Sequence, residues 1–234
     1  MKMNSRNKTF SFFFIAFFLF AMIFISVTGI AQEKKMNSLQ NKSNIDLPAP
    51  SLKGKISLEE AIKNRQSIRD FAAHPLTLQE LSQLLWALQG KTRDWGARAT
   101  PSAGALFPLE VYVALQEGVF QYSSANHRLI RCLETDVHHQ LAYAALGQDS
   151  VAKAPAVFVI TAVYERTSKK YGNRAERYVK MEAGHAAQNL LLQVTVLGLR
   201  AVPIGAFHDE KVKQVLHLPV NHEPLYLIPV GKEQ

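Results

Sequence analysis

The stretch that decides the fold is RYVKMEAGHAAQNLLLQVTVLGLRAVPIGAF, residues 177–207. Apolar residues recur in its first two thirds at intervals of three and four, which is the pattern of a helix packed on a core. Gly198 follows the last of them, where glycine often ends a helix because it tolerates left-handed backbone. The stretch therefore predicts a long helix, followed by a short buried strand over residues 199–204.

Small residues interrupt this stretch at two places. Gly184, Ala186 and Ala187 keep the first half of the helix thin, so another backbone can come close. After the strand, Gly205 and Ala206 carry no bulky side chain, so their backbone N–H groups could face a flat ligand. By itself the pattern is also that of an ordinary core helix and strand.

The N-terminal segment is not expected to belong to the fold. Residues 10–30 are uncharged and mostly apolar, and Lys2, Arg6 and Lys8 precede them. Gly29 and Ala31 are small residues at the positions that a signal peptidase reads, so we expect a signal peptide over residues 1–31. The run could also span a bilayer as an uncleaved anchor. The protein is therefore expected to be exported, periplasmic or extracellular, and to contact a membrane only through residues 10–30.

Charge and cysteine content exclude several classes of function. Removing residues 1–31 takes away three basic residues and lowers the formal net charge from +8 to +5. No cluster of Lys and Arg with interleaved aromatic residues indicates nucleic-acid binding. The mildly basic balance suits an anionic cofactor or substrate. The single cysteine, Cys132, excludes an intramolecular disulfide framework and is expected to be a buried apolar side chain.

The length of 234 residues suits one domain, preceded by a linker. Residues 32–55 are polar and contain Pro48-Ala49-Pro50, so they predict a tether or extended arm. The folded domain is expected over residues 56–234. Capping-box patterns at 57–60 and 77–80 predict two helix starts, and the first helix is expected to bury Leu58 and Ile62.

The rest of the chain alternates between strand and helix patterns. Residues 109–115 predict a half-buried strand, and residues 119–122 and 128–133 predict a hairpin. Residues 136–146 predict a helix, the apolar run 156–164 a central strand, and residues 225–230 a closing strand. This order of elements predicts an α+β layer fold.

Two segments could bind a ligand. Arg65, Ser67 and Arg69 lie at a helix end and could hold a phosphate, because each guanidinium offers a fork of charged donors; a solvated basic turn is the alternative. Residues 101–108 begin with little side-chain bulk, so a ligand could approach their backbone. The nucleophile-elbow and phosphate-loop motifs are absent, so Ser102 is not expected to attack a substrate.

The eight histidines do not predict a metal site. His138 and His139 are adjacent and would point apart on a helix. Glu182-x-x-His185 has the spacing of di-iron bundles, but such a site needs two copies and the chain has one. No catalytic metal is expected.

Four segments together resemble the FMN-dependent nitroreductase superfamily, and most closely its branch of SagB-type dehydrogenases, which form thiazoles and oxazoles. The segments are RQSIRDF (65–71), PSAGALFP (101–108), EAGHAAQNL (182–190) and PIGAF (203–207). The resemblance covers residues 56–232. It implies a nitroreductase-like α/β sandwich of the α+β class, with a central, mostly antiparallel sheet flanked by helices. It also implies a homodimer with FMN at the subunit interface.

The resemblance implies roles for individual residues. The FMN phosphate and the polar edge of the ring would be held by Arg65, Ser67 and Arg69, with Gln66 beside them and Lys232 reaching the phosphate. The partner subunit would place four residues against the cofactor: Pro101, Ser102, Ala103 and Gly104. Four more would lie along the isoalloxazine, with an N–H near Gly205 or Ala206 donating to flavin N5: Pro203, Ile204, Gly205 and Ala206.

Two further positions bear on the reaction. Lys170-Tyr171 matches a Lys-Tyr pair of the dehydrogenase branch, which is implicated in proton abstraction from an azoline ring, and a buried lysine can act as such a base. An exposed pair in a charged loop is the alternative. Many nitroreductases carry an asparagine at the position of Ala105. In the dehydrogenase branch an alanine occupies that position, as in this chain.

The resemblance implies an FMN oxidoreductase that moves a hydride between a donor, such as NAD(P)H, and a small organic acceptor. The acceptor would be of the nitro, quinone or enone type, and the cycle would be ping-pong. One alternative is an azoline dehydrogenase acting on peptides, against which export argues because such relatives work inside the cell. A degenerate flavin fold that serves as a binding module is the other.

Overall fold

The computed structural model describes residues 43–233. The expected signal peptide or anchor over residues 1–31 and the first part of the expected tether lie outside the described residues. Between residues 43 and 233, no helix has both the length and the apolar character that a membrane span requires.

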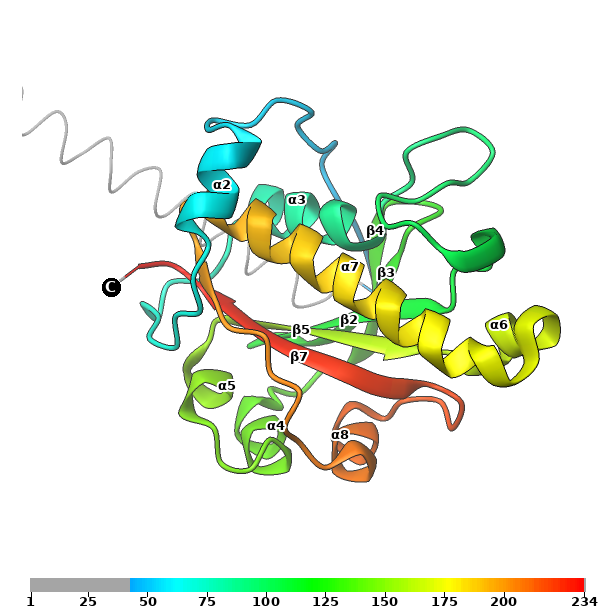
Figure 1. The fold of residues 1–234 in the computed structure, drawn as a ribbon. Helices are drawn as coiled ribbons and strands as arrows, with labels where there is room; N and C mark the ends of the chain where they lie inside the picture. Colours follow the sequence, from blue (N-terminus) through cyan, green and yellow to red (C-terminus); the bar gives the residue numbers. More distant parts are fainter. Residues whose placement is uncertain (1–42, 234) are drawn as a thin grey trace, which may run out of the picture. The chain divides into compact units, whose positions relative to one another are not determined.

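One sheet runs through the described part of the chain (Figure 1). Its seven strands lie in the order β1-β4-β3-β2-β5-β7-β6, and all neighbouring strands are antiparallel. The predicted α+β fold with a mostly antiparallel sheet is therefore confirmed. The strands are β1 Asn44–Asp46, β2 Leu109–Leu115, β3 Gly118–Ser123, β4 Arg128–Leu133, β5 Ala156–Ala162, β6 Arg200–Ala201 and β7 Glu223–Gly231.

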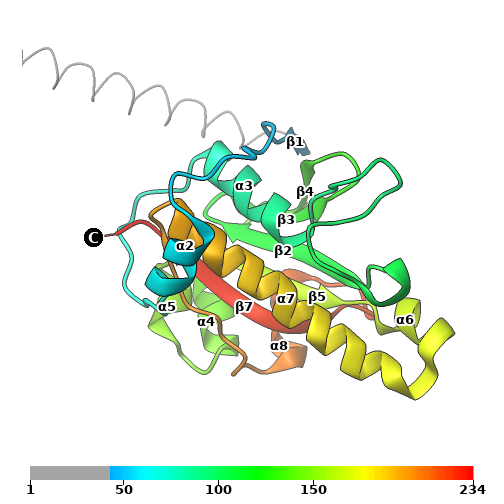
Figure 2. The ribbon, with the colours of Figure 1, turned by 45° about the horizontal axis from the view of Figure 1, so that its top comes forward.

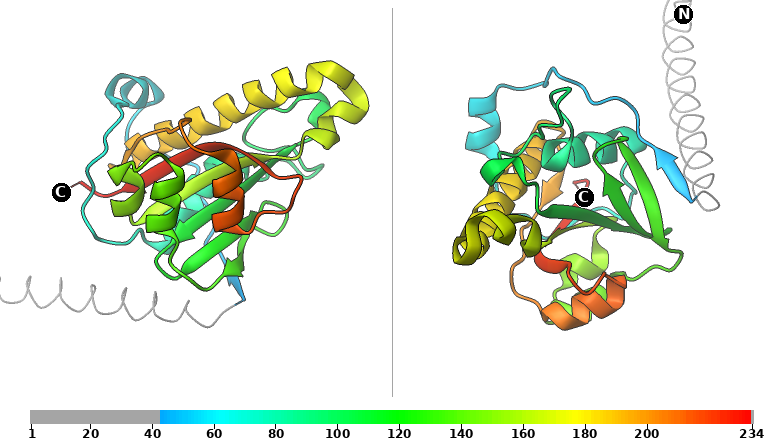
Figure 3. Two further views of the ribbon diagram at one scale, coloured as in Figure 1. Left: turned by 90° about the horizontal axis from the view of Figure 1, so that it is seen from below. Right: turned by 90° about the vertical axis from the view of Figure 1, so that its right-hand side faces the viewer.

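Helices cover both faces of this sheet (Figures 1 and 3). On one side, α3 and α7 cover the sheet, with α2 against one end of α7. On the other side, α4, α5 and α8 pack on β3, β5 and β7 around a shared apolar core. The helices are α2 Leu58–Asn64, α3 Leu78–Gln89, α4 His138–Ala144, α5 Asp149–Lys153, α6 Tyr164–Tyr171, α7 Ala175–Val196 and α8 Asp209–Leu216.

The two central strands are fully sandwiched. All seven residues of β5 are buried, as predicted for a central strand. β2 was expected to be half-buried, but six of its seven residues are buried. The reason is that β2 lies between β3 and β5, with helices on both faces, so its second face is also covered.

The long helix predicted from residues 177–197 is confirmed as α7, and Gly198 ends it with a φ of 69°. Ala186 and Ala187 belong to its buried stripe, so these small residues pack against the core of the same chain. Gly184 differs, because a Cβ at that position would meet nothing within 4 Å. α7 therefore keeps one thin, open position on its outer face.

Both predicted capping boxes are confirmed, at Ser57 with Glu60 and at Thr77 with Glu80. The expectation that the first helix buries Leu58 and Ile62 is wrong, since these side chains are 61% and 57% exposed. Ala61 is the buried residue of α2 instead. A helix of seven residues that contacts the fold through one small side chain leaves its larger apolar side chains uncovered.

Two other expectations also need correction. The second half of the expected tether is part of the fold from Ser43 on, because β1 pairs with β4 and Ser51 N donates to Gln83 Oε1 at 2.7 Å. Cys132, expected to be buried, is exposed. It alternates along β4 with better-covered residues and lies on the side of that strand that its neighbours do not cover.

Candidate functional site

The first group of candidate residues gathers where the chain leaves α2. Ser67 forms a parallel bridge with Ala201 of β6, and Ile68 N donates to Ala201 O at 2.9 Å. Ala72 N donates to Lys232 O at 3.0 Å, beyond the end of β7. These backbone contacts bring residues 65–69, Lys232 and the segment after β6 to one end of the sheet, which we call the arginine end.

The basic side chains at the arginine end are largely uncommitted. Within residues 43–233, neither Arg65 nor Arg69 forms an ion pair with a carboxylate. Gln66, Ser67 and Arg69 are exposed and Arg65 is partly so. Lys232 Nζ has only a distant carboxylate partner, Glu80 Oε2 at 3.9 Å. Guanidinium groups of this kind can take up an anion such as a phosphate.

The loop after β6 leads away from the arginine end along β7 and presents backbone donors there. Ile204 exchanges two hydrogen bonds with Leu227, at 2.8 and 3.0 Å, and Gln148 Nε2 donates to Ala206 O at 3.0 Å. Between these anchors, Gly205 and Ala206 are exposed, and neither N–H donates to an acceptor in the described part of the chain. A Cβ on Gly205 would meet nothing within 4 Å. Hydrogen bonds therefore fix the loop at Ile204 and at Ala206 O, while the N–H groups of Gly205 and Ala206 stay accessible.

The second group of candidate residues lies around the loop of residues 101–107, called the 101–107 loop below. A Cβ on Gly104 would come within 2.9 Å of Tyr171 Oη and 3.1 Å of Lys170 Nζ. Tyr171 packs edge-to-face on Tyr178, with ring centroids 5.1 Å apart. The structure thus places the predicted pair at the C-terminal end of α6 directly against Gly104 of the same chain, and Lys170 is exposed there.

The 101–107 loop has a strained backbone. Gly104, Ala105 and Phe107 all have left-handed φ values, of 62°, 54° and 46°. For a residue with a side chain this conformation costs about 1–2 kcal/mol, so neighbouring contacts must hold it. Phe107 N donates to Ser102 Oγ at 2.9 Å, and Phe107 O accepts from Arg166 Nη1 at 3.0 Å. The Arg98 guanidinium lies 4.8 Å from the Phe107 ring centroid.

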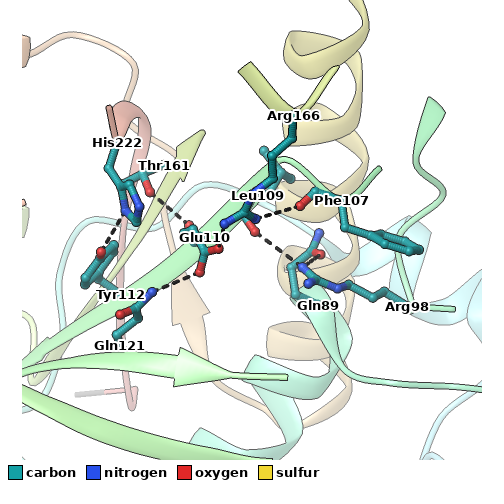
Figure 4. A network of polar contacts seen from close by, with 10 residues as sticks. All are labelled: Gln89, Arg98, Phe107, Leu109, Glu110, Tyr112, Gln121, Thr161, Arg166 and His222. Atoms are coloured by element: carbon teal, nitrogen blue, oxygen red, sulfur yellow. Dashed lines mark hydrogen bonds and ion pairs between the residues drawn. The ribbon is translucent and has the colours of Figure 1, made fainter. Parts of the chain in front are cut away.

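A polar network supports this loop from behind (Figure 4). Glu110 of β2 pairs with Arg166 of α6 at 2.5 Å and accepts from Gln121 at 2.9 Å. Arg98 Nη1 donates to Gln89 Oε1 at 2.9 Å and to Leu109 O at 3.3 Å, and burial lowers the pKa of Arg98. A pocket of about 260 Å³ lies beside these groups. The network fixes α6, and with it Lys170, relative to the sheet.

Sequence reasoning missed one feature of this region. Glu182 of α7 is 3% exposed, and its Oε1 has no hydrogen-bond partner among the described residues. Burial raises its pKa to about 7, while Ser102 and Arg98 lower it. The available signal was its spacing of four residues from Ala186, which places it in the apolar stripe. No group of three potential metal ligands occurs between residues 43 and 233.

The two groups of candidate residues do not meet in one chain. The arginine end lies at the C-terminal end of α7, whereas the 101–107 loop and α6 lie at its N-terminal end (Figure 2). A helix of 22 residues is about 33 Å long, at 1.5 Å per residue. The two groups therefore lie apart in one chain.

The chain is similar in sequence to known nitroreductase-family proteins. The sequence model described as the nitroreductase family matches residues 62–232. MJ1384 of Methanocaldococcus jannaschii, which carries a provisional nitroreductase name, is 45% identical over 184 residues, covering 76% of this chain and 92% of that protein. The trifolitoxin operon protein TfxC of Rhizobium leguminosarum bv. trifolii is 25% identical over 224 residues, covering 85% of this chain and 62% of TfxC.

Solved structures share the fold. A crystal structure from Ralstonia eutropha JMP134, also provisionally named a nitroreductase, has a TM-score of 0.75 and 30% identity, with 82% of this chain and 90% of that chain covered. The Escherichia coli microcin synthetase McbBCD complex has a TM-score of 0.62 and 23% identity, covering 85% of this chain and 81% of that chain. The latter likeness concerns the fold alone.

Proposed function

Because this chain belongs to the nitroreductase family, we propose that it is an FMN-dependent oxidoreductase with a ping-pong cycle. It would move a hydride from a donor such as NAD(P)H to a small organic acceptor of the nitro, quinone or enone type. Family membership makes it a nitroreductase-family oxidoreductase, and the cofactor, the donor and the acceptor are the proposal.

The residues present fit FMN. The observation that carries the proposal is the arginine end, where Arg65 and Arg69 form no ion pair among residues 43–233 and from which the chain after β6 leads to a loop with two open N–H groups. A phosphate suits the guanidinium groups and the Ser67 hydroxyl, and a flat ring suits the open face of Gly205. FMN, when bound, supplies the hydride chemistry. The chain's own residues would hold and orient it.

We propose a homodimer that joins the two groups of candidate residues. In it, the 101–107 loop and Lys170-Tyr171 of one chain would face the arginine end of the other chain. Three observations support this arrangement. Gly184 leaves an open position on α7, and the apolar side chains of Leu58 and Ile62 are exposed. In the described part of the chain, the two groups of candidate residues lie toward different ends of α7. A two-fold axis across α7 would form two equivalent sites.

The cofactor is tested by the visible absorption spectrum of purified residues 32–234. We expect a yellow protein that releases about one FMN per chain on denaturation, with one site per chain as the symmetry of a dimer requires. A colourless protein that takes up no added FMN would contradict the enzyme proposal. It would favour the alternative of a flavin fold kept as a binding module.

The phosphate site is tested by Arg69→Ala. Loss of a charge-assisted contact is expected to cost about 1.5–3 kcal/mol of FMN binding free energy. This corresponds to a rise in Kd of roughly 10- to 150-fold in a flavin fluorescence titration. Arg128→Ala is the matched control, because Arg128 lies on β4 and pairs with Asp46, away from the arginine end. Equal affinities of the two variants would show that the phosphate lies elsewhere.

Azoline dehydrogenation of a peptide is a second candidate function. The contact of Lys170 and Tyr171 with Gly104 favours it, as does the similarity to TfxC. Lys170 would take the proton from the ring carbon, with Tyr171 beside it, and FMN, when bound, would supply the acceptor for the hydride. This function predicts oxygen-dependent turnover of an azoline peptide and its loss in Lys170→Ala with FMN still bound.

Export remains a proposal based on residues 1–31. The predicted cleavage after Ala31 would give a mature chain starting at Gln32. The intact mass of the protein secreted by its host distinguishes a cleaved signal peptide from an anchor. Export would favour the small-molecule reaction over peptide modification.

A further inference from the structure

We propose that the pocket between β2 and β3, called the β2–β3 pocket below, binds a small organic carboxylate through the Arg98 guanidinium and the Gln89 amide. Its volume of about 260 Å³ is that of about nine water molecules in the liquid. The proposal goes beyond the proposed function and does not depend on it, because none of the residues proposed to hold FMN lines this pocket.

The sheet opens between β2 and β3 on one side of the pair Tyr112 and Gln121. That pair is the last in the ladder between the two strands, although both strands continue past it. Beyond it, residues 109–111 are paired with β5 and residues 122–123 with β4. Residues of both segments line the pocket, together with the turn that follows β3. The diverging strands therefore form the pocket, and it lies within the frame of the sheet.

Two side chains bring hydrogen-bond donors to the β2–β3 pocket, and Figure 4 shows both pointing toward Leu109 at the start of β2. Arg98 Nη1 donates to Leu109 O at 3.3 Å and to Gln89 Oε1 at 2.9 Å. The second bond fixes the orientation of the Gln89 amide, because the opposite orientation would bring two donors together. The Gln89 amide nitrogen is buried and has no acceptor among residues 43–233. A bound acceptor would satisfy it.

The β2–β3 pocket has a positive charge without an ion-pair partner in the described part of the chain. The acidic residue of its lining, Glu110, pairs with Arg166 Nη2 at 2.5 Å and accepts from Gln121 Nε2 at 2.9 Å. No carboxylate between residues 43 and 233 lies within ion-pair distance of Arg98. A guanidinium offers its donors in a fixed fork that matches the two oxygens of a carboxylate.

The rest of the lining favours a carboxylate with a short apolar body. Leu109, Val111 and Ile130 supply apolar surface beside the two donors. A phosphate suits the pocket less well, because its second negative charge would lie near the Glu110 carboxylate. One negative charge on a small organic molecule therefore matches both the charge and the lining.

Arg98 also connects the β2–β3 pocket with the 101–107 loop. Its guanidinium lies 4.8 Å from the Phe107 ring centroid, and Phe107 is one of the left-handed residues of that loop. A carboxylate that binds Arg98 would therefore contact the same group that packs against the loop.

The test titrates the full chain with butyrate and with butyramide, which has nearly the same shape and no charge. By calorimetry we expect one butyrate per chain with a Kd of about 10 mM or less, and butyramide to bind at least about tenfold more weakly. In proton–nitrogen correlation spectra, butyrate should shift the amide signals of residues 109–111 and 122–125. Equal binding of the two probes, tighter binding of inorganic phosphate, or shifts confined to other residues would overturn the proposal.

Gln89→Glu tests the two donors directly. Arg98 Nη1 already donates to this side chain at 2.9 Å, so the variant's carboxylate would pair with the guanidinium and compete with the ligand. We expect the Kd for butyrate to rise about tenfold or more. Gln214→Glu is the matched control, since it adds the same charge at an exposed position of α8 and should leave the Kd unchanged. Unchanged affinity in Gln89→Glu would contradict the proposal.

Two further variants keep the outcomes distinct. Should Gln89→Glu not fold, Ile130→Glu brings a negative charge to an exposed residue of the lining and should also raise the Kd for butyrate. Arg69→Ala should not change that Kd, and a tenfold rise in this variant would place the anion at the arginine end and overturn the proposal. The titration needs no flavin, so a colourless protein contradicts the proposed function and leaves this test intact.

Discussion

Gly205 and Gly104 have opposite surroundings, although both lie in the candidate site. A Cβ on Gly205 meets open space, whereas a Cβ on Gly104 meets Tyr171 Oη at 2.9 Å. We expect Gly205→Val to change the free energy of unfolding by less than about 0.5 kcal/mol, since nothing within the chain is displaced. The same variant should lose flavin, because its side chain would occupy the space in front of the loop. Thermal unfolding and flavin content measure the two effects.

Gly104→Ala serves as the contrasting variant. It combines a left-handed φ of 62° with the close contact to Tyr171, so it should destabilise the fold by about 1–2 kcal/mol. If Gly205→Val retained flavin at wild-type affinity, the ring would not lie along residues 203–206.

Glu182 also has a consequence for stability. Burial raises its pKa from 4.5 to about 7 in the folded chain, so the native state holds this proton more tightly than the unfolded state does. The free energy of unfolding is therefore highest below pH 4.5, falls as the pH rises from 4.5 to 7, and stays at its lower value above pH 7. A pKa difference of one between the folded and unfolded chain corresponds to about 1.4 kcal/mol, so the total loss is roughly 3 kcal/mol.

Glu182→Gln removes this pH-dependent loss. We expect the variant to be more stable than the wild-type chain by about 2–3 kcal/mol at pH 8, and the gain to vanish near pH 4.5. Urea unfolding at the two pH values measures it, with Glu210→Gln as the exposed control. Parallel pH profiles for the wild-type chain and Glu182→Gln would show that Glu182 titrates normally.

The helix starts make a prediction at the scale of secondary structure. Thr77 Oγ1 accepts from Glu80 N at 3.2 Å at the start of α3, a helix with eight buried residues. Thr77→Ala leaves that N–H without its cap and should cost about 1 kcal/mol in the free energy of unfolding. Thr77→Ser keeps the hydroxyl and should cost less. Equal losses in chemical denaturation would mean that the hydroxyl contributes nothing.

Elements with a strong local period could be predicted from the sequence. The apolar spacing of α7, the continuous run of β5 and the capping residues of α2 and α3 act within a few residues, so the chain itself records them. The burial of Leu58 and Ile62 could not be predicted, because a capping box fixes where a helix starts but not how close its neighbours come. The same holds for residues 44–46, which become a strand only because β4 offers them an edge.

The proposed dimer would join two groups of candidate residues that lie apart in one chain, and this gives a test of it. Arg69→Ala and Lys170→Ala should each inactivate any reaction that needs both the flavin and Lys170, such as the azoline reaction. A mixed dimer of the two variants would contain one doubly altered site and one site with neither change. Random mixing should then restore about a quarter of the wild-type activity, since half the dimers would be mixed.

The outcome of mixing separates two arrangements. If one chain formed a complete site by itself, no mixture of the two variants would regain activity. Analytical ultracentrifugation of the mixture provides the control, since it shows whether dimers form at all. Restored activity with no dimer present would contradict the arrangement across α7.

The sequence by itself determined the family, the class of fold and the residues of each motif. Four short segments in a fixed order are a property of the chain, and each records a local requirement: paired guanidinium groups, a loop without bulk, a helix stripe, a glycine after a strand. These requirements involve residues within a few positions of one another, so no knowledge of packing is needed to see them.

Only the tertiary structure decided how the motifs are grouped. It placed residues 65–69 beside Ala201 and brought Lys232 to the same end of the sheet, and it placed Gly104 beside Lys170-Tyr171, toward the other end of α7. It also buried Glu182 within α7. The physical reason is that contacts between residues far apart in the chain depend on which helix covers which face of the sheet. That choice is made by the packing of the whole core, and no single segment encodes it.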